Sequence, residues 1–193
     1  QKFIEDNRLD DTWYLYENGE NKGYPANFYY TMSLCTGDVV FLADQDDIWV
    51  DTKLEKMVKV LQEHPEINII ACRYGLINGE GKEIRSFIKP SHGTGIRKMK
   101  AITLYDIFYR YEWPGMVLAY RNIWYQKWNK TISEIPHDIF ICAKAAEEGS
   151  FFQLDEILAW QRRHENNTAR EEHRIRKLLN KKRKLWEIEK YLK

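Results

Sequence analysis

A run of five apolar residues that ends in a cluster of acidic residues constrains this chain most. The run is Val39-Val40-Phe41-Leu42-Ala43, and Asp44-Gln45-Asp46-Asp47 follows it directly. An apolar run of this length and composition predicts a strand covered on both faces, as in the sheets of α/β domains. Carboxylates at the end of such a strand repel one another and resist desolvation, so they need a compensating charge. A bound Mg²⁺ or Mn²⁺ is the simplest compensation, because these ions prefer carboxylate oxygens.

Two less specific interpretations of the acidic cluster stay open at this point. The cluster could be a solvated acidic loop, or Asp47 could only cap the helix that follows. The position of the cluster favours the metal site, because open α/β sheets bind ligands at the carboxyl ends of their strands.

Helices and strands are predicted in alternation along most of the chain, which indicates an α/β domain with a largely parallel central sheet. Helical spacing predicts a helix over Tyr24–Cys35 and another that Asp51 caps and that ends before Pro65. The apolar side of the second helix is predicted to carry Leu54, Met57, Val58 and Leu61. The other predicted elements are strands at Trp13–Tyr16, Ile67–Cys72, Met116–Tyr120 and Phe151–Leu154, a hairpin turn at Asn78–Gly81, an irregular connection over Phe87–Lys100, and helices over Ala101–Tyr111 and from about Asp138.

Composition excludes several classes of protein. The chain has 193 residues, of which 44% are hydrophobic, and this is enough apolar mass for the core of one domain. Its 30 basic and 29 acidic residues nearly cancel, which argues against nucleic acid as a partner. The three cysteines, Cys35, Cys72 and Cys142, are too scattered for a zinc motif, so we expect reduced thiols and a cytoplasmic location.

The last 25 residues differ in charge from the rest of the chain. Residues 169–193 contain ten Lys and Arg against four Asp and Glu, and their apolar residues trace an imperfect helical stripe. We therefore divide the chain into a domain at 1–168 and an amphipathic basic helix at 169–193. This helix either packs on the domain with a solvated basic side or lies peripherally on the inner, anionic face of a membrane.

The segment around the acidic cluster resembles the central block of inverting family 2 glycosyltransferases. The resemblance extends from Asn21-Lys22-Gly23-Tyr24 and Asn27-Phe28, through Gly37 to Trp49, to Lys53-Leu54, and it is nearest to the rhamnosyltransferase-like group of bacterial surface polysaccharide synthesis. It implies a GT-A fold, a nucleoside-diphosphate sugar as donor, a saccharide or lipid-linked acceptor, and Mg²⁺ or Mn²⁺. In such a site Asp46 is the expected metal ligand, Asp44 lies near the metal or the ribose, and Asp47 supports them.

Three downstream segments are similar to the same family. The first is Pro114-Gly115-Met116-Val117-Leu118-Ala119, beside the donor sugar and acceptor. The second is Pro136-His137-Asp138, where Asp138 would be the catalytic base. Asp138 could alternatively be only the N-cap of a helix. The third is Trp160-Gln161-Arg162-Arg163-His164 with Asn166-Asn167, in which Gln161 replaces the usual Tyr.

The resemblance implies three groups of site residues. The metal ligands are Asp46, Asp44 and His164; the donor and its diphosphate are bound by Asp44, Asp47, Arg162 and Asn27; and the acceptor or sugar is bound by Trp49, Gly115 and His137.

Two motifs of the family do not occur in the sequence. These are the first strand with Pro-x-Tyr-Asn and the second strand with its Asp-Gly-Ser-like turn, so we expect this chain to begin after both. Two other functions stay open: a nucleotidyltransferase, which also uses carboxylates at strand ends, and a non-catalytic module that binds sugars or a partner.

Overall fold

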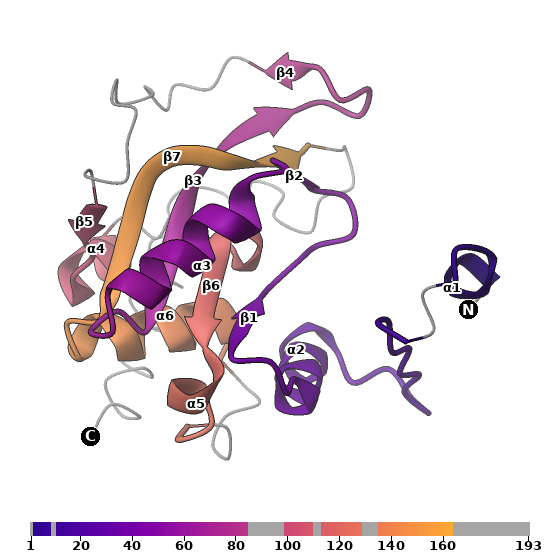
Figure 1. Ribbon diagram of the computed structural model, residues 1–193, viewed down its shortest axis with the longest axis horizontal. Coiled ribbons are helices and arrows are strands. Elements are labelled where there is room, and N and C mark those ends of the chain that lie inside the picture. The colour runs from indigo at the N-terminus through magenta and orange to yellow at the C-terminus, as the bar shows by residue number, and fades with distance from the viewer. Residues whose placement is uncertain (1, 9–10, 85–98, 110–112, 129–134, 164–193) are drawn as a thin grey trace.

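A computed structural model describes residues 2–8, 11–84, 99–109, 113–128 and 135–163 of the chain (Figure 1). The helices are α1 (Lys2–Asp6), α2 (Tyr24–Leu34), α3 (Lys53–Glu63), α4 (Leu104–Tyr109), the 3₁₀ turn η1 (Gly115–Val117), α5 (Asn122–Tyr125) and α6 (His137–Glu147). The strands are β1 (Val39–Phe41), β2 (Ile48–Trp49), β3 (Ile69–Ile77), β4 (Glu83–Ile84), β5 (Met99–Ala101), β6 (Leu118–Arg121) and β7 (Phe151–Arg162).

The strands form one mixed sheet with the order β1-β6-β3-β7-β2, to which β4 adds beside β3 and β5 beside β7. The α/β class is confirmed, but the expectation of a largely parallel sheet is wrong for the described strands. Among their pairings only β3 with β7 is parallel, and the others are antiparallel. Alternation of helices and strands indicates crossover connections, but it does not show which strands become neighbours.

Strand β7 is much longer than the predicted Phe151–Leu154. It continues to Arg162 and pairs with β3 through two register shifts, and it curves across the sheet (Figure 1). At its far end Trp160 pairs with Ile48 and Ala159 with Trp49 on β2. The curvature therefore brings the end of β7 beside the segment that follows the acidic cluster.

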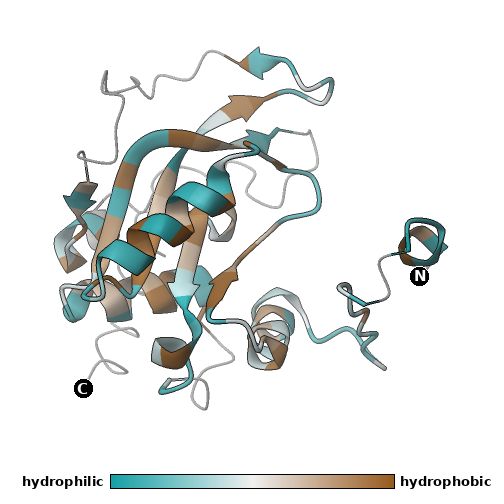
Figure 2. Ribbon diagram, in the orientation of Figure 1, coloured by the Kyte–Doolittle hydropathy of each residue, from teal (hydrophilic) through white to brown (hydrophobic). Residues whose placement is uncertain are grey.

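Helix α3 lies against the sheet with a different face from the predicted one. Its buried residues are Lys53, Met57, Val60 and Leu61, whereas Leu54 is 48% exposed. The hydropathy colouring shows polar residues along the outer side of the helix (Figure 2). The predicted cap is also wrong, because Thr52 and not Asp51 precedes the helix. A lysine thus takes a position on the buried face that hydropathy alone assigns to a leucine.

Other predictions are confirmed or corrected by the described residues. The helix at Tyr24–Cys35 and the hairpin at Asn78–Gly81 are confirmed, the latter joining β3 to β4. Trp13–Tyr16 forms no strand, and its side chains are exposed. Met99–Ala101 pairs with β7, although the sequence predicts an irregular connection at Met99–Lys100 and the start of a helix at Ala101.

The core is formed mainly by β3, β6 and α6, to which α3 adds Met57, Val60 and Leu61 and β7 adds Phe151, Leu154, Leu158 and Ala159. All three cysteines are free, as the sequence predicts. No helix in the described ranges has the length and apolar character needed to cross a membrane. His164, the pair Asn166-Asn167 and the predicted basic helix at 169–193 lie outside the described residues.

Candidate functional site

The acidic cluster Asp44–Asp47 forms the turn between β1 and β2, at the end of β1 as predicted. We call this segment the acidic loop. Arg162, the last residue of β7, holds it through two hydrogen bonds: its amide nitrogen donates to Asp47 Oδ1 at 2.9 Å, and its Nε donates to the Asp46 carbonyl at 3.0 Å. The same guanidinium donates through Nη1 to the carbonyls of Asn78 and Gly79, at 3.1 and 2.9 Å. The described contacts of Arg162 therefore fix the acidic loop, and its binding of a diphosphate stays a prediction.

The carboxylates of the acidic loop influence one another and a carboxylate from another element. Burial raises the pKa of Asp44, and the negative charges of Asp46 and Asp138 raise it further. The pKa of Asp47 is also raised by burial, although the hydrogen bond from the Arg162 backbone opposes this shift. Asp138 lies in the first turn of α6, far from the acidic loop in sequence, and the fold brings its charge close enough to Asp44 to affect the pKa of that carboxylate.

Asp138 is buried, with only 7% of its surface exposed. Its Oδ1 accepts a hydrogen bond from the backbone nitrogen of Ile139 at 2.9 Å. The N-cap position of α6 is occupied by Pro136, so the alternative interpretation of Asp138 as an N-cap is wrong. A carboxylate on the rigid first turn of a helix has a fixed position, which suits a group that must accept a proton at a defined atom.

His137 packs among aromatic rings beside Asp138. Its ring stacks on Phe28 with a centroid distance of 3.9 Å and an interplanar angle of 7°, and the edge of Tyr24 lies at 5.5 Å. The residue is 1% exposed, and neither ring nitrogen has a hydrogen-bond partner among the described residues. Burial lowers the pKa of His137 to about 4, so the imidazole is neutral at physiological pH.

Gly115 makes close contact with this imidazole. A Cβ at position 115 would lie 3.1 Å from His137 Nε2, which is unusually tight, and 3.5 Å from the Leu42 side chain, which is ordinary contact. Because Leu42 lies two residues before the acidic loop, Gly115 is placed between the loop and α6. The structure thus brings Gly115 and His137 together, as the sequence predicts for an acceptor or sugar site, although their binding role stays a prediction.

Trp49 and Asn27 lie outside the group formed by the acidic loop, Gly115, His137 and Asp138. Trp49 is on β2, with its ring 5.9 Å from that of Phe41. Asn27 is exposed on α2, and its Oδ1 accepts a hydrogen bond from Asn18 Nδ2 at 2.6 Å. The proposed roles of both residues stay predictions.

Two residues near the site, Tyr24 and Lys53, lie in the segment that resembles the family, but the sequence assigns them no role. Burial and the charges of Asp138 and Asp44 raise the pKa of Tyr24, which indicates that its hydroxyl lies near both carboxylates. The signal in the sequence is its position directly after Gly23, whose positive φ of 74° begins α2. The second residue is Lys53. The sequence marks it only by its position in the segment that resembles family 2 glycosyltransferases.

The acidic loop offers a suitable but incomplete set of metal ligands. Among the described residues, no three His, Cys, Asp or Glu side chains converge as a metal site. Mg²⁺ and Mn²⁺ nevertheless bind through one or two carboxylates when substrate phosphates and water supply the other ligands. Asp44 and Asp46, whose mutual repulsion raises the pKa of Asp44, therefore fit an ion that arrives with a diphosphate.

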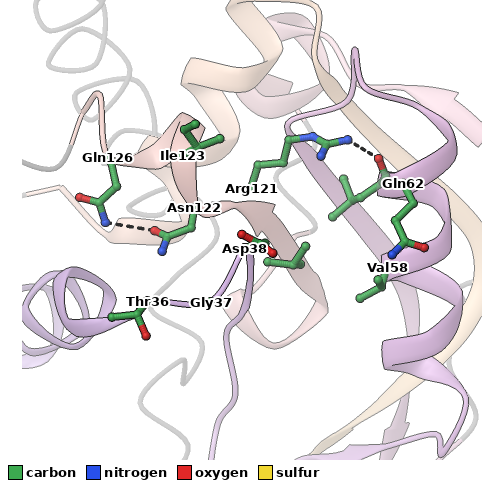
Figure 3. A pocket seen from close by; sticks show the side chains of 11 residues that line it. Thr36, Gly37, Asp38, Val58, Gln62, Arg121, Asn122, Ile123 and Gln126 are labelled. Atoms are coloured by element: carbon green, nitrogen blue, oxygen red, sulfur yellow. Dashed lines mark hydrogen bonds between the residues drawn. The ribbon is translucent and has the colours of Figure 1, made fainter.

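A pocket of about 730 Å³ lies at the opposite end of β1 from the acidic loop (Figure 3). Asp38, Arg121 and Asn122 are among the residues that line it. The Arg121 guanidinium donates a hydrogen bond to the carbonyl oxygen of Leu61 in α3 (Figure 3). Arg121 also donates to the carbonyls of Ile67 and His64. None of the residues that line this pocket belongs to the acidic loop or to α6, so the pocket is separate from the carboxylate site.

Comparisons with known proteins identify the family of the sequence and similar solved structures. The sequence model described as glycosyl transferase family 2 matches residues 1–117. TarS 1-349 from S. aureus in complex with UDP-GlcNAc is similar in structure, with a TM-score of 0.65 and 13% identity over 97% of this chain and 53% of that one. Another structure of S. aureus TarS 1-349 gives a TM-score of 0.54 with 12% identity over 83% of this chain and 47% of that one.

A third TarS structure from S. aureus gives a TM-score of 0.56 and 13% identity, and covers 84% of this chain and 28% of that one. The chain therefore spans about half or less of each of these proteins. At such identities the likeness concerns the fold, and it supports the GT-A type. No curated protein matches the sequence.

Proposed function

The chain belongs to glycosyl transferase family 2, and from this premise we propose that it transfers a sugar with inversion from a nucleoside-diphosphate sugar to a saccharide or lipid-linked acceptor. The observation that carries the proposal is that Gly115 contacts both Leu42, two residues before the acidic loop, and His137, the neighbour of Asp138. The negative charge of Asp138 accordingly helps to raise the pKa of Asp44, after burial and the charge of Asp46. A donor site needs carboxylates for a metal, and an inverting transfer needs a base on the acceptor side. The proximity of Asp138 to the acidic loop supports the proposal that both belong to one site.

Asp138 acts in this proposal as the catalytic base. One of its carboxylate oxygens accepts the proton of the acceptor hydroxyl while the hydroxyl oxygen forms its bond to the anomeric carbon. The bond between the anomeric carbon and the diphosphate oxygen breaks, and the nucleoside diphosphate leaves with the electron pair. Mg²⁺ or Mn²⁺ bound by Asp46 and Asp44 would supply positive charge beside the departing diphosphate.

Gly115 and His137 form the acceptor and sugar side of the proposed site. The absence of a side chain at Gly115 lets the His137 imidazole approach the backbone of η1 closely. The neutral imidazole of His137 carries two nitrogens without partners among the described residues, and one of them faces Gly115. Because His137 is only 1% exposed, its role in this proposal is to support the acceptor and sugar side through its packing against Gly115, and not to contact the sugar.

The likeness to TarS supports a nucleotide sugar as donor, since one of those structures holds UDP-GlcNAc. We propose a donor of this chemical class and a role in bacterial surface polysaccharide synthesis. The proposed location is cytoplasmic, with contact at the membrane surface through residues 169–193.

Calorimetry with UDP and dTDP, each with and without Mn²⁺, tests the proposal. We expect binding of at least one nucleotide that depends on Mn²⁺ and is lost in Asp46→Asn, because the variant has lost a charged ligand. Asp51→Asn is the matched control, since Asp51 is exposed just after β2 and outside the acidic loop. If the intact protein binds neither nucleotide in a metal-dependent way, the transferase proposal is wrong and a non-catalytic module becomes the better interpretation.

A further inference from the structure

Helix α3 buries the charged member of a lysine-leucine pair and exposes the apolar one. Lys53 has no exposed surface, whereas the neighbouring Leu54 is 48% exposed. Lysine is almost never fully buried unless its ammonium group is paired. A rotation of α3 that buried Leu54 instead would agree with hydropathy, so something specific must stabilise Lys53 in its place.

The Lys53 ammonium contacts three elements besides its own helix. Its Nζ donates a hydrogen bond of 2.6 Å to the carbonyl oxygen of Met116 in η1. The same nitrogen lies 3.6 Å from the ring centroid of Trp49 on β2 and 6.0 Å from that of Phe41 on β1. An ammonium over the face of an indole is a favourable cation–π arrangement, and its strength increases when the pair is desolvated.

The charge of Lys53 persists in this environment. Burial lowers the pKa of Lys53 to about 8, while the nearby Cys72 on β3 and Asp47 in the acidic loop raise it. Lys53 is therefore mostly protonated at neutral pH and can act as both a donor and a cation. An apolar side chain of similar volume could fill the space but could not hold a carbonyl and a ring face together.

We propose that Lys53 is a positioning residue that ties the Trp49 indole to the Met116 carbonyl and so sets the spacing between the acidic loop and Gly115. Trp49 follows the acidic loop by two residues, and Gly115 directly precedes Met116. Lys53 does not touch the substrate, because it has no exposed surface. The importance of this spacing for catalysis rests on the proposed function. The spacing itself can be measured whether or not the protein is a transferase.

Fluorine NMR of protein labelled with 5-fluorotryptophan measures the positioning directly. The chain has seven tryptophans, and Trp49 and Trp113 report on the two ends of the link. Trp113 is buried two residues before Gly115, with its Nε1 bonded to Gln153 at 3.1 Å. Trp124 bonds to Glu148 through its Nε1 and serves as the internal reference. Replacing each of these tryptophans by Phe assigns its resonance.

In Lys53→Met we expect the Trp49 and Trp113 resonances to shift or broaden, while that of Trp124 stays unchanged. Lys53→Arg retains a cation that stacks on aromatic faces, so it should restore part of the Trp49 signal. Lys59→Met is the matched control, because Lys59 lies on the same helix with an exposed side chain. If Trp49 and Trp113 keep their resonances in Lys53→Met, the positioning role is refuted.

Kinetics then separate positioning from folding. Replacing a buried charge by an apolar side chain is often neutral for stability, so Lys53→Met should fold, and Lys53→Arg gives a second folded variant to examine. With UDP-GlcNAc as the probe, we expect turnover to fall about tenfold to a hundredfold in Lys53→Met, with partial recovery in Lys53→Arg. Mn²⁺-dependent affinity for UDP should stay within about twofold, because the link does not touch the diphosphate.

A fall in turnover that only parallels a loss of folded protein would also contradict the inference. Failure of the wild-type protein to bind any nucleotide would instead contradict the proposed function. The fluorine NMR spectra would then still test the positioning role of Lys53.

Discussion

Lowering the pH from 7 to 5 should destabilise the fold through His137. Burial lowers the pKa of this residue to about 4 in the folded protein, against 6.5 for an ordinary histidine. Between these values the unfolded chain binds a proton that the folded protein excludes, so stability falls as the pH falls. The two pKa values give a loss of about 2 kcal/mol between pH 7 and pH 5, since a tenfold difference in proton affinity corresponds to about 1.4 kcal/mol.

Urea unfolding at pH 7 and pH 5 measures this loss in the wild-type protein and in His137→Phe. Phenylalanine preserves a ring that can stack on Phe28 and removes both unpartnered nitrogens. Asp44 has a raised pKa and therefore opposes the trend, but it does so in both proteins. The quantity of interest is consequently the difference between the two pH dependences. His64→Gln is the control, because His64 is partly exposed beside Glu66.

We expect the wild-type protein to lose about 2 kcal/mol more than His137→Phe between the two pH values, and His64→Gln to behave like the wild type. Parallel losses in the wild type and His137→Phe would refute the assignment of a buried, neutral imidazole. They would also remove the basis for placing unpartnered nitrogens beside Gly115.

Three further predictions follow from the described contacts and the charge of the C-terminal segment. Asp138→Asn should lower turnover by about 10²–10⁴-fold in steady-state kinetics while Mn²⁺-dependent UDP binding persists, and unchanged turnover would exclude Asp138 as the base. Gly75→Ala should destabilise the protein by about 1–3 kcal/mol in urea unfolding, because its Cβ would overlap the Trp160 ring. Gly79→Ala, where a Cβ meets nothing within 4 Å, should be much milder, and equal losses would contradict the packing argument. Deletion of residues 169–193 should weaken sedimentation with anionic liposomes, and unchanged sedimentation would remove the proposed membrane contact.

Local features of the fold could be predicted because they depend on neighbours in sequence. The strand before the acidic loop, the helix over most of Tyr24–Cys35 and the turn at Asn78–Gly81 all carry strong local signals. The pairing of strands could not be predicted in this way, since it depends on contacts between distant segments. Trp13–Tyr16 illustrates the same limit, because an aromatic run forms a strand only where a partner strand is available.

The residues of the candidate site could also be predicted only in part. Short motifs identify the acidic loop and the pair His137–Asp138, but their proximity follows only from the fold. Lys53 stays hidden in the sequence because hydropathy marks lysine as a surface residue. The buried face of α3 is consequently displaced from the predicted one, and the displacement depends on a carbonyl and an indole that belong to other elements.

The contacts of Arg162 bear on how fast a ligand can be bound. Its side chain and backbone join the acidic loop to the turn at Asn78–Gly79 and to the end of β7. A loop held in this way is already ordered before a ligand arrives, so binding loses little conformational entropy. Association should then be limited by diffusion and charge and not by a slow rearrangement of the loop.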